Sequence, residues 1–336
     1  MKNISQTNKK YIGIELLRLL LCFWIVLFHC AKYKKIHYKY FWRLFHVPTF
    51  FLLSFYFYYQ IINGRIIEKI KIRFERLLIP YFLWPIIIFF INNIFFKTFI
   101  IDKTAIRKYL KYLFTQFIFG KGIYGIFWFQ NNLIFLSLLF SIISLLFKNN
   151  FMGILHFLLS LSLYLHYSGK CYAFFKFTQY KNSLGTLIEL MPLAILGCTY
   201  KYINLLSITN KLPVYIKYLL CFYIYFLFEY DIFLLPIGFR YPNIILYIIA
   251  SSIFLIFFGS LKFERFKINI IINIITKSTG GIYYIHPFVR NNLERYFIFF
   301  KKRTYTSASL IYVISYLICI IGSKHFQNNK LKYLFI

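Results

Sequence analysis

Two ionisable side chains, Arg18 and His29, lie inside the first long apolar stretch of the chain, which runs from Tyr11 to Cys30. The stretch has the length of a membrane-spanning helix, about 20 residues, and a charged group near the bilayer centre costs about 2.5–3.5 kcal/mol. Eleven positions separate the pair, so both side chains are expected on one helix face, roughly 16 Å apart along the axis. Glu15 precedes Arg18 at i,i+3, close enough to pair with it. We therefore expect this face to meet protein or water rather than lipid.

These residue types suit acid–base and anion-binding chemistry. A neutral imidazole can accept a proton from an attacking hydroxyl group, so His29 is a candidate general base. A guanidinium can hold a phosphate or a carboxylate through two parallel hydrogen bonds, so Arg18 is a candidate for substrate binding or charge stabilisation. Each residue alone could also be structural, Arg18 as an ion pair with Glu15 and His29 as a polar residue at the membrane interface. Their shared face favours a functional site.

The composition is typical of a protein that crosses the membrane several times. Of the 336 residues, 60% are hydrophobic and 24% aromatic, whereas only 15% are charged, compared with about 25% in soluble domains. No polar segment is long enough to build a soluble core of domain size. We predict one integral-membrane domain over residues 1–336, all-α, surrounded by membrane lipids in a cell membrane, taken as a bacterial cytoplasmic membrane.

Apolar runs bounded by polar, proline or glycine residues predict about ten transmembrane helices. The first span is 11–31 and the last 305–322, and between them lie 45–62, 80–96, 126–147, 152–168, 184–201, 213–229, 243–261 and 279–299. Pro80 is expected at the start of the third span, where its missing N–H is harmless. Residues 106–117 alternate basic and apolar types at helical spacing, which predicts an interfacial amphipathic helix. Lys and Arg divide almost evenly between the two sides, so they do not orient the chain.

The charge and the remaining motifs exclude several classes of site. The net charge of +31 suits anionic lipids or anionic substrates, although biased composition accounts for much of the lysine. No basic segment belongs to a nucleic-acid-binding module, so no nucleic-acid partner is expected. The six cysteines contain no Cys-x-x-Cys pair, and with nine acidic residues and no His-Glu-x-x-His pattern we expect no metal site. The glycines of 120–125 match G-x-G-x-x-G without the preceding strand that a dinucleotide site needs.

The Arg-x10-His pattern of Arg18 and His29 is the signature of the acyltransferase-3 family of integral-membrane O-acyltransferases, and the chain resembles that family at four further places. In the family's order, these are His46-Val-Pro48-Thr-Phe50-Phe51-Leu-Leu-Ser54, Arg73-Phe-Glu-Arg76-Leu-Leu-Ile-Pro80-Tyr81, Trp128-Phe129, and Ser278-Thr-Gly280-Gly-Ile-Tyr283-Tyr-Ile-His286-Pro287. The chain departs from the family pattern at four positions, with Glu15 in place of Asp, Phe55 in place of Gly, Gly125 in place of His and Gln130 in place of Leu.

The resemblance implies a membrane O-acyltransferase. Members move an acyl group, usually acetyl, from a cytoplasmic thioester donor to a sugar hydroxyl, often on a lipid-linked or surface polysaccharide. His29 would be the base or the acyl relay, and Arg18, beside the carboxylate of Glu15, would orient the donor or stabilise charge. Arg73 and Arg76 would bind the donor's phosphates, although basic residues at a span end can also anchor a helix. The partners would be an acyl-CoA donor and a glycan or glycolipid acceptor, with acetyl-CoA as a co-substrate and no bound cofactor.

Five further residues of the matching segments are candidate substrate-binding residues: His46, Ser54, Trp128, Tyr283 and His286. The aromatic rings of Trp128 and Tyr283 suit a platform for a sugar or for adenine. In a chain this rich in aromatic residues, packing in the core is the alternative for either ring.

Two other functions fit the same composition. A glycan-lipid transporter or a polysaccharide polymerase of a surface-polysaccharide pathway would also be polytopic, basic and aromatic, but would not be expected to carry the ordered motifs. A third reading is an inactive family member that acts as a scaffold or sensor. Ester-linked acetate on the glycan, compared between the natural protein and His29→Ala, separates these readings.

Overall fold

The computed structural model of the protein describes residues 12–30, 46–62, 66–96, 107, 110–111, 127–168, 184–213, 215–220, 222–223, 244–261, 276, 278–297 and 304–336. Every regular element within these ranges is a helix, so the predicted all-α fold class is confirmed. The longer helices are α1 (Ile12–Cys30), α3 (His46–Ile62), α4 (Ile66–Phe96), α6 (Phe127–Leu146), α7 (Phe151–Tyr167), α9 (Leu184–Tyr202), α12 (Ile244–Gly259), α14 (Thr279–Tyr296) and α16 (Thr304–His325). The shorter ones are α10 (Leu205–Thr209) and the 3-10 turns η1 (Lys148–Asn150) and η2 (Lys330–Leu334).

The described helices form a membrane bundle. Within the described residues, four segments are long and apolar enough to cross a bilayer, namely Ile12–Cys30, Ile70–Ile91, Phe127–Leu146 and Tyr305–His325, and α12 is a shorter apolar helix. Large apolar side chains such as Phe90, Leu145 and Leu317 are more than half exposed, as expected where lipid rather than water is the solvent. Of the predicted span 213–229 the structure describes residues 213, 215–220 and 222–223, and the predicted interfacial helix 106–117 lies largely outside the described residues.

The start of α4 corrects the sequence-based prediction for the third span. We expected a helix to begin at Pro80, but α4 begins at Ile66 and contains both Pro80 and Pro85. Proline inside a helix removes one backbone hydrogen bond, and membrane helices tolerate this because neighbouring groups satisfy the freed carbonyl. The consequence is that Arg73 and Arg76 belong to the same helix as the apolar segment that follows them.

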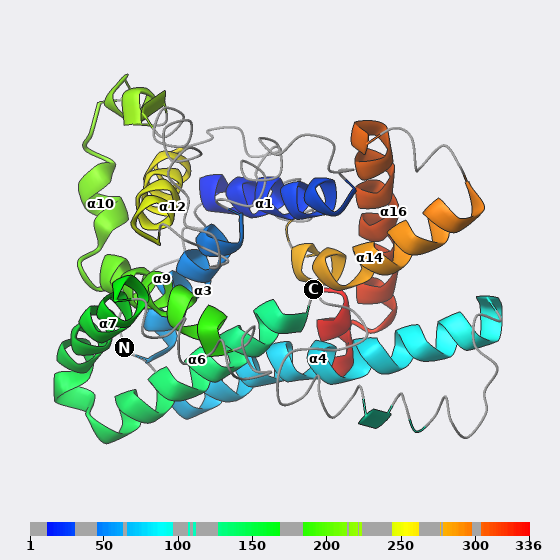
Figure 1. Cartoon of the computed structure of the whole chain (residues 1–336), viewed down its shortest axis with the longest axis horizontal. Helices are drawn as coiled ribbons and strands as arrows, with labels where there is room; N and C mark the ends of the chain where they lie inside the picture. Colours follow the sequence, from blue (N-terminus) through cyan, green and yellow to red (C-terminus); the bar gives the residue numbers. More distant parts are fainter. Residues whose placement is uncertain are drawn as a thin grey trace, which may run out of the picture.

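Helix α1 joins two hydrophobic cores. Its first half, through Ile14, Leu17 and Leu21, packs into a core shared with α3, α6, α7, α9 and α12. Its second half, through Val26 and Leu27, packs into a core shared with α4, α14 and α16. Figure 1 shows α1 above α4, with α3 and α9 on one side and α14 and α16 on the other. Side chains at the middle of α1 therefore lie between the two halves of the bundle.

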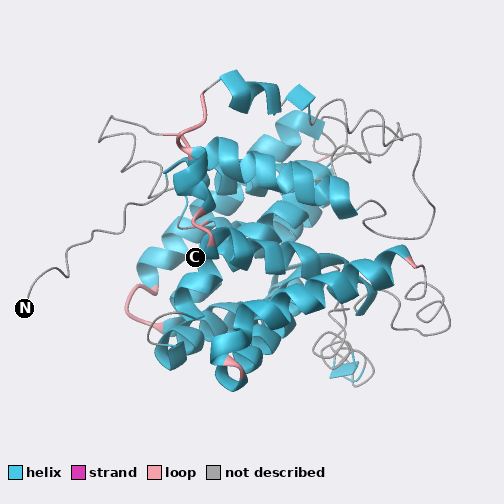
Figure 2. Ribbon diagram, turned by 90° about the vertical axis from the view of Figure 1, so that its left-hand side faces the viewer, coloured by secondary structure: helices cyan, strands magenta, loops and turns pink. Residues whose placement is uncertain are grey.

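The end of the chain also lies within the bundle. After α16 the chain turns at residues 326–329 and forms η2, which packs against α4, α14 and α16. In both Figure 1 and Figure 2 the label C stands among the helices rather than at the edge of the molecule. Residues 330–336 thus approach the same interior space that the middle of α1 faces.

Candidate active site

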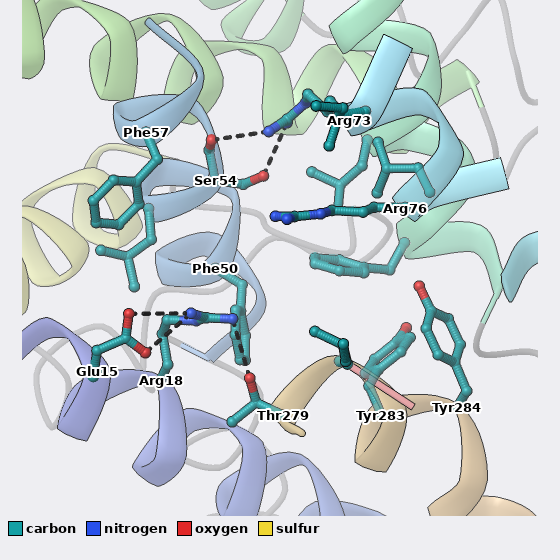
Figure 3. A pocket seen from close by; sticks show the side chains of 17 residues that line it. Glu15, Arg18, Phe50, Ser54, Phe57, Arg73, Arg76, Thr279, Tyr283 and Tyr284 are labelled. Carbon is teal, nitrogen blue, oxygen red and sulfur yellow. Dashed lines mark hydrogen bonds and ion pairs between the residues drawn. The ribbon is translucent and has the colours of Figure 1, made fainter. Parts of the chain in front are cut away.

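A pocket of about 510 Å³ lies between α1, α3, α4, α6 and the beginning of α14 (Figure 3). Its charged wall residues are Glu15, Arg18, Arg73 and Arg76, and its aromatic wall residues are Phe50, Phe57, Phe129, Tyr283 and Tyr284. The volume is in the range of small-molecule sites, about 300–1,000 Å³. Three guanidinium groups and one carboxylate give the side chains of the wall a formal charge of +2, which favours an anionic ligand.

Arg18 connects α1 to α14 at one side of this pocket. Its Nη1 lies 3.0 Å from Oε2 of Glu15, so the predicted i,i+3 ion pair is present. Its Nη2 donates a hydrogen bond of 3.1 Å to Oγ1 of Thr279, which in turn donates to the carbonyl oxygen of Thr276 over 3.0 Å. The guanidinium is therefore fixed by a carboxylate from its own helix and by a hydroxyl group at the start of α14 (Figure 3).

Arg73 is held by the two helices that flank it. Its Nη2 donates to Oγ of Ser54 on α3 and its Nε donates to Oγ of Ser137 on α6, each at a distance of 3.0 Å. Its Nη1 also donates to the carbonyl oxygen of Ser54 over 3.4 Å. The guanidinium carbon lies 4.4 Å from the ring centre of Tyr58, within the range of a cation–π contact. These contacts use three of the five N–H groups of Arg73, so the side chain ties α4 to α3 and α6.

Arg76 lies one helical turn further along α4 and is more open. It is exposed and lines the pocket, and Figure 3 shows its side chain extending into the space that Arg18 faces from α1. Its guanidinium carbon is 5.7 Å from the ring centre of Tyr333 in η2. No hydrogen bond or ion pair joins Arg76 to the part of the chain that the structure describes. Its N–H groups are consequently available to an anion.

His29 and His286 lie beyond the pocket wall, next to each other. Their ring centres are 5.1 Å apart, and the ring of Tyr283, which lines the pocket, is 6.2 Å from that of His286. His286 is completely buried and its Nδ1 is 3.0 Å from the carbonyl oxygen of Ile282. A carbonyl can only accept, so Nδ1 carries the proton and Nε2 carries the lone pair of the neutral ring. His29 is thus separated from the pocket by two aromatic rings.

Both functional candidates on α1 nevertheless face α14, as their shared stripe predicts. Arg18 bonds to Thr279 near the start of α14, and His29 lies beside His286 two turns later. Arg290, one turn further, donates from Nη1 to the backbone oxygen of His29 over 2.6 Å. The wall of this pocket includes Arg18 but not His29.

The other predicted substrate-binding residues divide between the pocket and the core. Ser54 and Tyr283 lie on the pocket wall. His46 is buried beside Phe28, with ring centres 5.6 Å apart, and Trp128 packs against the first core instead of lining the pocket. The neighbouring ring of Phe129 takes the place on the wall that the sequence suggested for Trp128.

Sequence reasoning missed several wall residues. Thr279, which bonds to Arg18, lies inside the family-like segment Ser278–Pro287, so its hydroxyl group could have been named as a candidate from the sequence. Phe50 lies likewise inside the His46–Ser54 segment. Ile336 on the wall lies outside all of these segments, as does Tyr333, which contacts Arg76 without lining the pocket, and no local signal in the sequence identifies either residue.

Comparison with known proteins agrees with the motifs. A family model described as an acyltransferase domain, that of the acyltransferase-3 family, matches residues 11–324. The search of curated proteins and the search of solved structures give no match to the chain. The matched range contains the whole pocket except the wall contributed by Ile336.

Proposed function

The chain belongs to the acyltransferase-3 family and is a membrane acyltransferase, and from this premise we propose that it moves an acyl group, in the first place acetyl, from a CoA thioester to a hydroxyl group of a surface or lipid-linked glycan. The observation that carries the proposal is the positively charged pocket inside the bundle, where Arg18 and Arg76 approach one space from two helices. We place this activity in a bacterial cytoplasmic membrane.

The donor end of the proposal rests on charge and shape. Coenzyme A carries several phosphate oxygens, and arginine binds such groups through its planar set of N–H donors. Arg76 has N–H groups available for this purpose, whereas Arg73 is engaged with Ser54 and Ser137 and holds the wall in place. The aromatic wall beside Arg76 includes Phe129 and Tyr283 and suits an adenine ring or the apolar part of the pantetheine arm.

The reaction end of the proposal uses His29. Its imidazole accepts the proton of the sugar hydroxyl while the oxygen attacks the carbonyl carbon of the thioester. The carbon–sulfur bond breaks, and the departing thiolate takes the proton, which gives free coenzyme A and an ester. In the alternative route, His29 attacks the thioester carbonyl, forms an acyl-imidazole and releases coenzyme A. The sugar hydroxyl then attacks this acyl group and frees His29, and water must be excluded until the acceptor arrives.

The placement of the two ends suggests the path of the donor. The pantetheine arm enters from the arginine side, and the rings of Tyr283 and His286, which separate the pocket from His29, move aside to let the thioester reach His29. The axial rise of about 16 Å between Arg18 and His29 is spanned by this extended arm, which keeps the phosphates at the arginines. The acceptor hydroxyl then reaches His29 from the other side of the bundle.

The decisive experiment measures transfer directly. The full chain is purified in lipid nanodiscs and supplied with acetyl-CoA labelled in the acetyl group, together with membranes that carry the glycan acceptor. We expect label in alkali-labile ester linkage on the glycan for the natural protein and a loss of at least about 100-fold for His29→Ala, as is usual when a general base is removed. His156→Ala is the matched control, because His156 is exposed on α7 and its Nε2 lies 3.3 Å from Thr199 Oγ1, away from the pocket.

Two outcomes would contradict the proposal. Equal labelling by the natural protein and His29→Ala would remove His29 from the reaction. Absence of ester-linked acetate, combined with altered glycan chain length or export in cells that lack the protein, would favour a transporter or a polymerase.

A further inference from the structure

The chain continues past the residues that the family model matches and returns to the pocket. The match ends at residue 324, and the last residues of α16 are followed by a segment, Phe326–Ile336, that contains η2. We call this segment the C-terminal strap. Its residue Leu334 is 3% exposed, and Ile336 forms part of the pocket wall. A segment outside the recognised domain thus contributes to the candidate active site.

The strap is fastened to α4 by specific contacts. The indole Nε1 of Trp84 donates a hydrogen bond of 3.0 Å to the carbonyl oxygen of Leu334, in a buried position. The ring of Phe335 lies edge-on to that of Trp84 and is stacked on that of Phe326, with centres 5.8 Å apart in each pair. Lys330 adds an ion pair of 2.6 Å with Glu75, the neighbour of Arg76.

Glycines on α14 and α16 allow the strap to approach this closely. A Cβ atom at Gly281 would lie 2.7 Å from the carbonyl group of Phe335, and one at Gly322 would meet the ring of the same residue. Backbone at such a distance leaves no room for any side chain. Helices α14 and α16 therefore carry glycine at the two positions where the strap packs against them.

The strap meets the binding machinery at Arg76. The Tyr333 ring is 5.7 Å from the Arg76 guanidinium carbon, which otherwise makes no hydrogen bond or ion pair within the described ranges. A carboxylate in this place would neutralise the arginine and compete with an incoming anion. An aromatic ring restricts the guanidinium through its π face and leaves the charge and the N–H edge available.

We propose that the C-terminal strap is a working part of the donor site and that Tyr333 is the positioning residue that holds Arg76 toward the phosphates of the donor. This inference rests on the proposed function, because it takes the anion bound by Arg76 to be coenzyme A. A restrained guanidinium loses less side-chain entropy when the anion binds than a free one does. The benefit is expected in donor binding and not in the chemical step.

The test is a series of ring substitutions in the full chain in nanodiscs, with coenzyme A as the probe for binding and acetyl-CoA for turnover. Tyr333→Leu removes the ring, and we expect its Kd for coenzyme A to rise about three- to tenfold, with a matching rise in KM and little change in kcat. Tyr333→Phe and Tyr333→Trp keep a π face and are expected to bind coenzyme A as tightly as the natural protein, which also shows that substitution at this position is compatible with folding.

The results separate the two levels of the proposal. If Tyr333→Leu binds coenzyme A as tightly as the natural protein, or if Tyr333→Phe weakens binding as much as Tyr333→Leu, the role of the ring is overturned while the proposed function stands. If the natural protein itself does not bind coenzyme A, or if Arg76→Ala leaves binding unchanged, the proposed donor site is contradicted, and the proposed role of the strap is contradicted with it.

Discussion

The Nε2 atom of His286 is buried beside the imidazole of His29 and has no hydrogen-bond partner among the described residues. A buried polar atom without a partner is costly, and a catalytic role is one of the explanations for such an atom. The tautomer fixed by the Ile282 carbonyl leaves a lone pair on this atom. A ring that can accept a proton therefore stands between His29 and Tyr283, on the side from which the donor is proposed to arrive.

Replacement of His286 tests whether this ring serves the reaction. We predict that His286→Asn lowers kcat about 10- to 100-fold and leaves the KM for acetyl-CoA within about twofold, because the arginines that bind the donor are untouched. Asparagine retains an N–H donor for the Ile282 carbonyl, so the fold of α14 should be preserved. The measurement is steady-state transfer in nanodiscs with His156→Ala as control, and an unchanged kcat would assign His286 to packing alone.

The hydrogen bond from Arg18 to Thr279 allows a second, graded test. Thr279→Val keeps the shape of the side chain but removes the oxygen that fixes Arg18, and we predict a loss of activity of about three- to tenfold, the effect of one partly exposed hydrogen bond worth about 1 kcal/mol. Thr279→Ser should restore most of the rate, and Arg18→Ala should lose considerably more than Thr279→Val. Initial rates at saturating donor provide the comparison, and equal rates for the valine and serine variants would argue against it.

Local features of the site were predictable from the sequence. The ion pair of Glu15 and Arg18 follows from their i,i+3 spacing on one helix, and the structure confirms it at 3.0 Å. The choice between Trp128 and Phe129 was not predictable in the same way, because adjacent residues on a helix point about 100° apart and both are aromatic. Only the packing of α6 decides which ring lines the pocket.

Contacts between distant segments could not be predicted from the sequence. Arg18 and Thr279 are 261 positions apart, and a single chain carries no local signal for such a pairing. The same holds for Tyr333, which lies next to Arg76 only because Trp84 and two glycines dock the strap on α4, α14 and α16. The start of α4 was also predicted wrongly. Proline favours the first turn of a helix, so Pro80 was taken as the start, but α4 begins at Ile66 and contains Pro80.

Close packing of α3 on α9 makes Gly197 a sensitive position. A Cβ atom there would collide with the backbone oxygen of Leu52 and lie 2.9 Å from the backbone nitrogen of Tyr56. We predict that Gly197→Ala lowers the free energy of unfolding by about 1–3 kcal/mol, as overpacking does. Gly153→Ala on α7 is the matched control, because no atom lies within 4 Å of a Cβ atom there, and alanine should be neutral or slightly stabilising. Thermal unfolding in detergent gives both values, and equal shifts would contradict the close approach.

The two arginines of the Arg73–Arg76 segment should separate stability from donor binding. Arg73→Lys gives up the forked hydrogen bonds to Ser54 and Ser137, so we predict that it lowers the free energy of unfolding by about 2–3 kcal/mol. Arg76→Lys keeps a charge without the planar N–H fork, and it is expected to leave the unfolding free energy within about 0.5 kcal/mol. Its KM for acetyl-CoA should instead rise about three- to tenfold, because a point charge replaces two parallel hydrogen bonds.

Thermal unfolding and donor titration on the same preparations test this division of roles, and Ser137→Ala is expected to reproduce part of the effect of Arg73→Lys on stability. The opposite pattern, a stable Arg73→Lys with weakened donor binding beside an unstable Arg76→Lys, would exchange the roles of the two side chains.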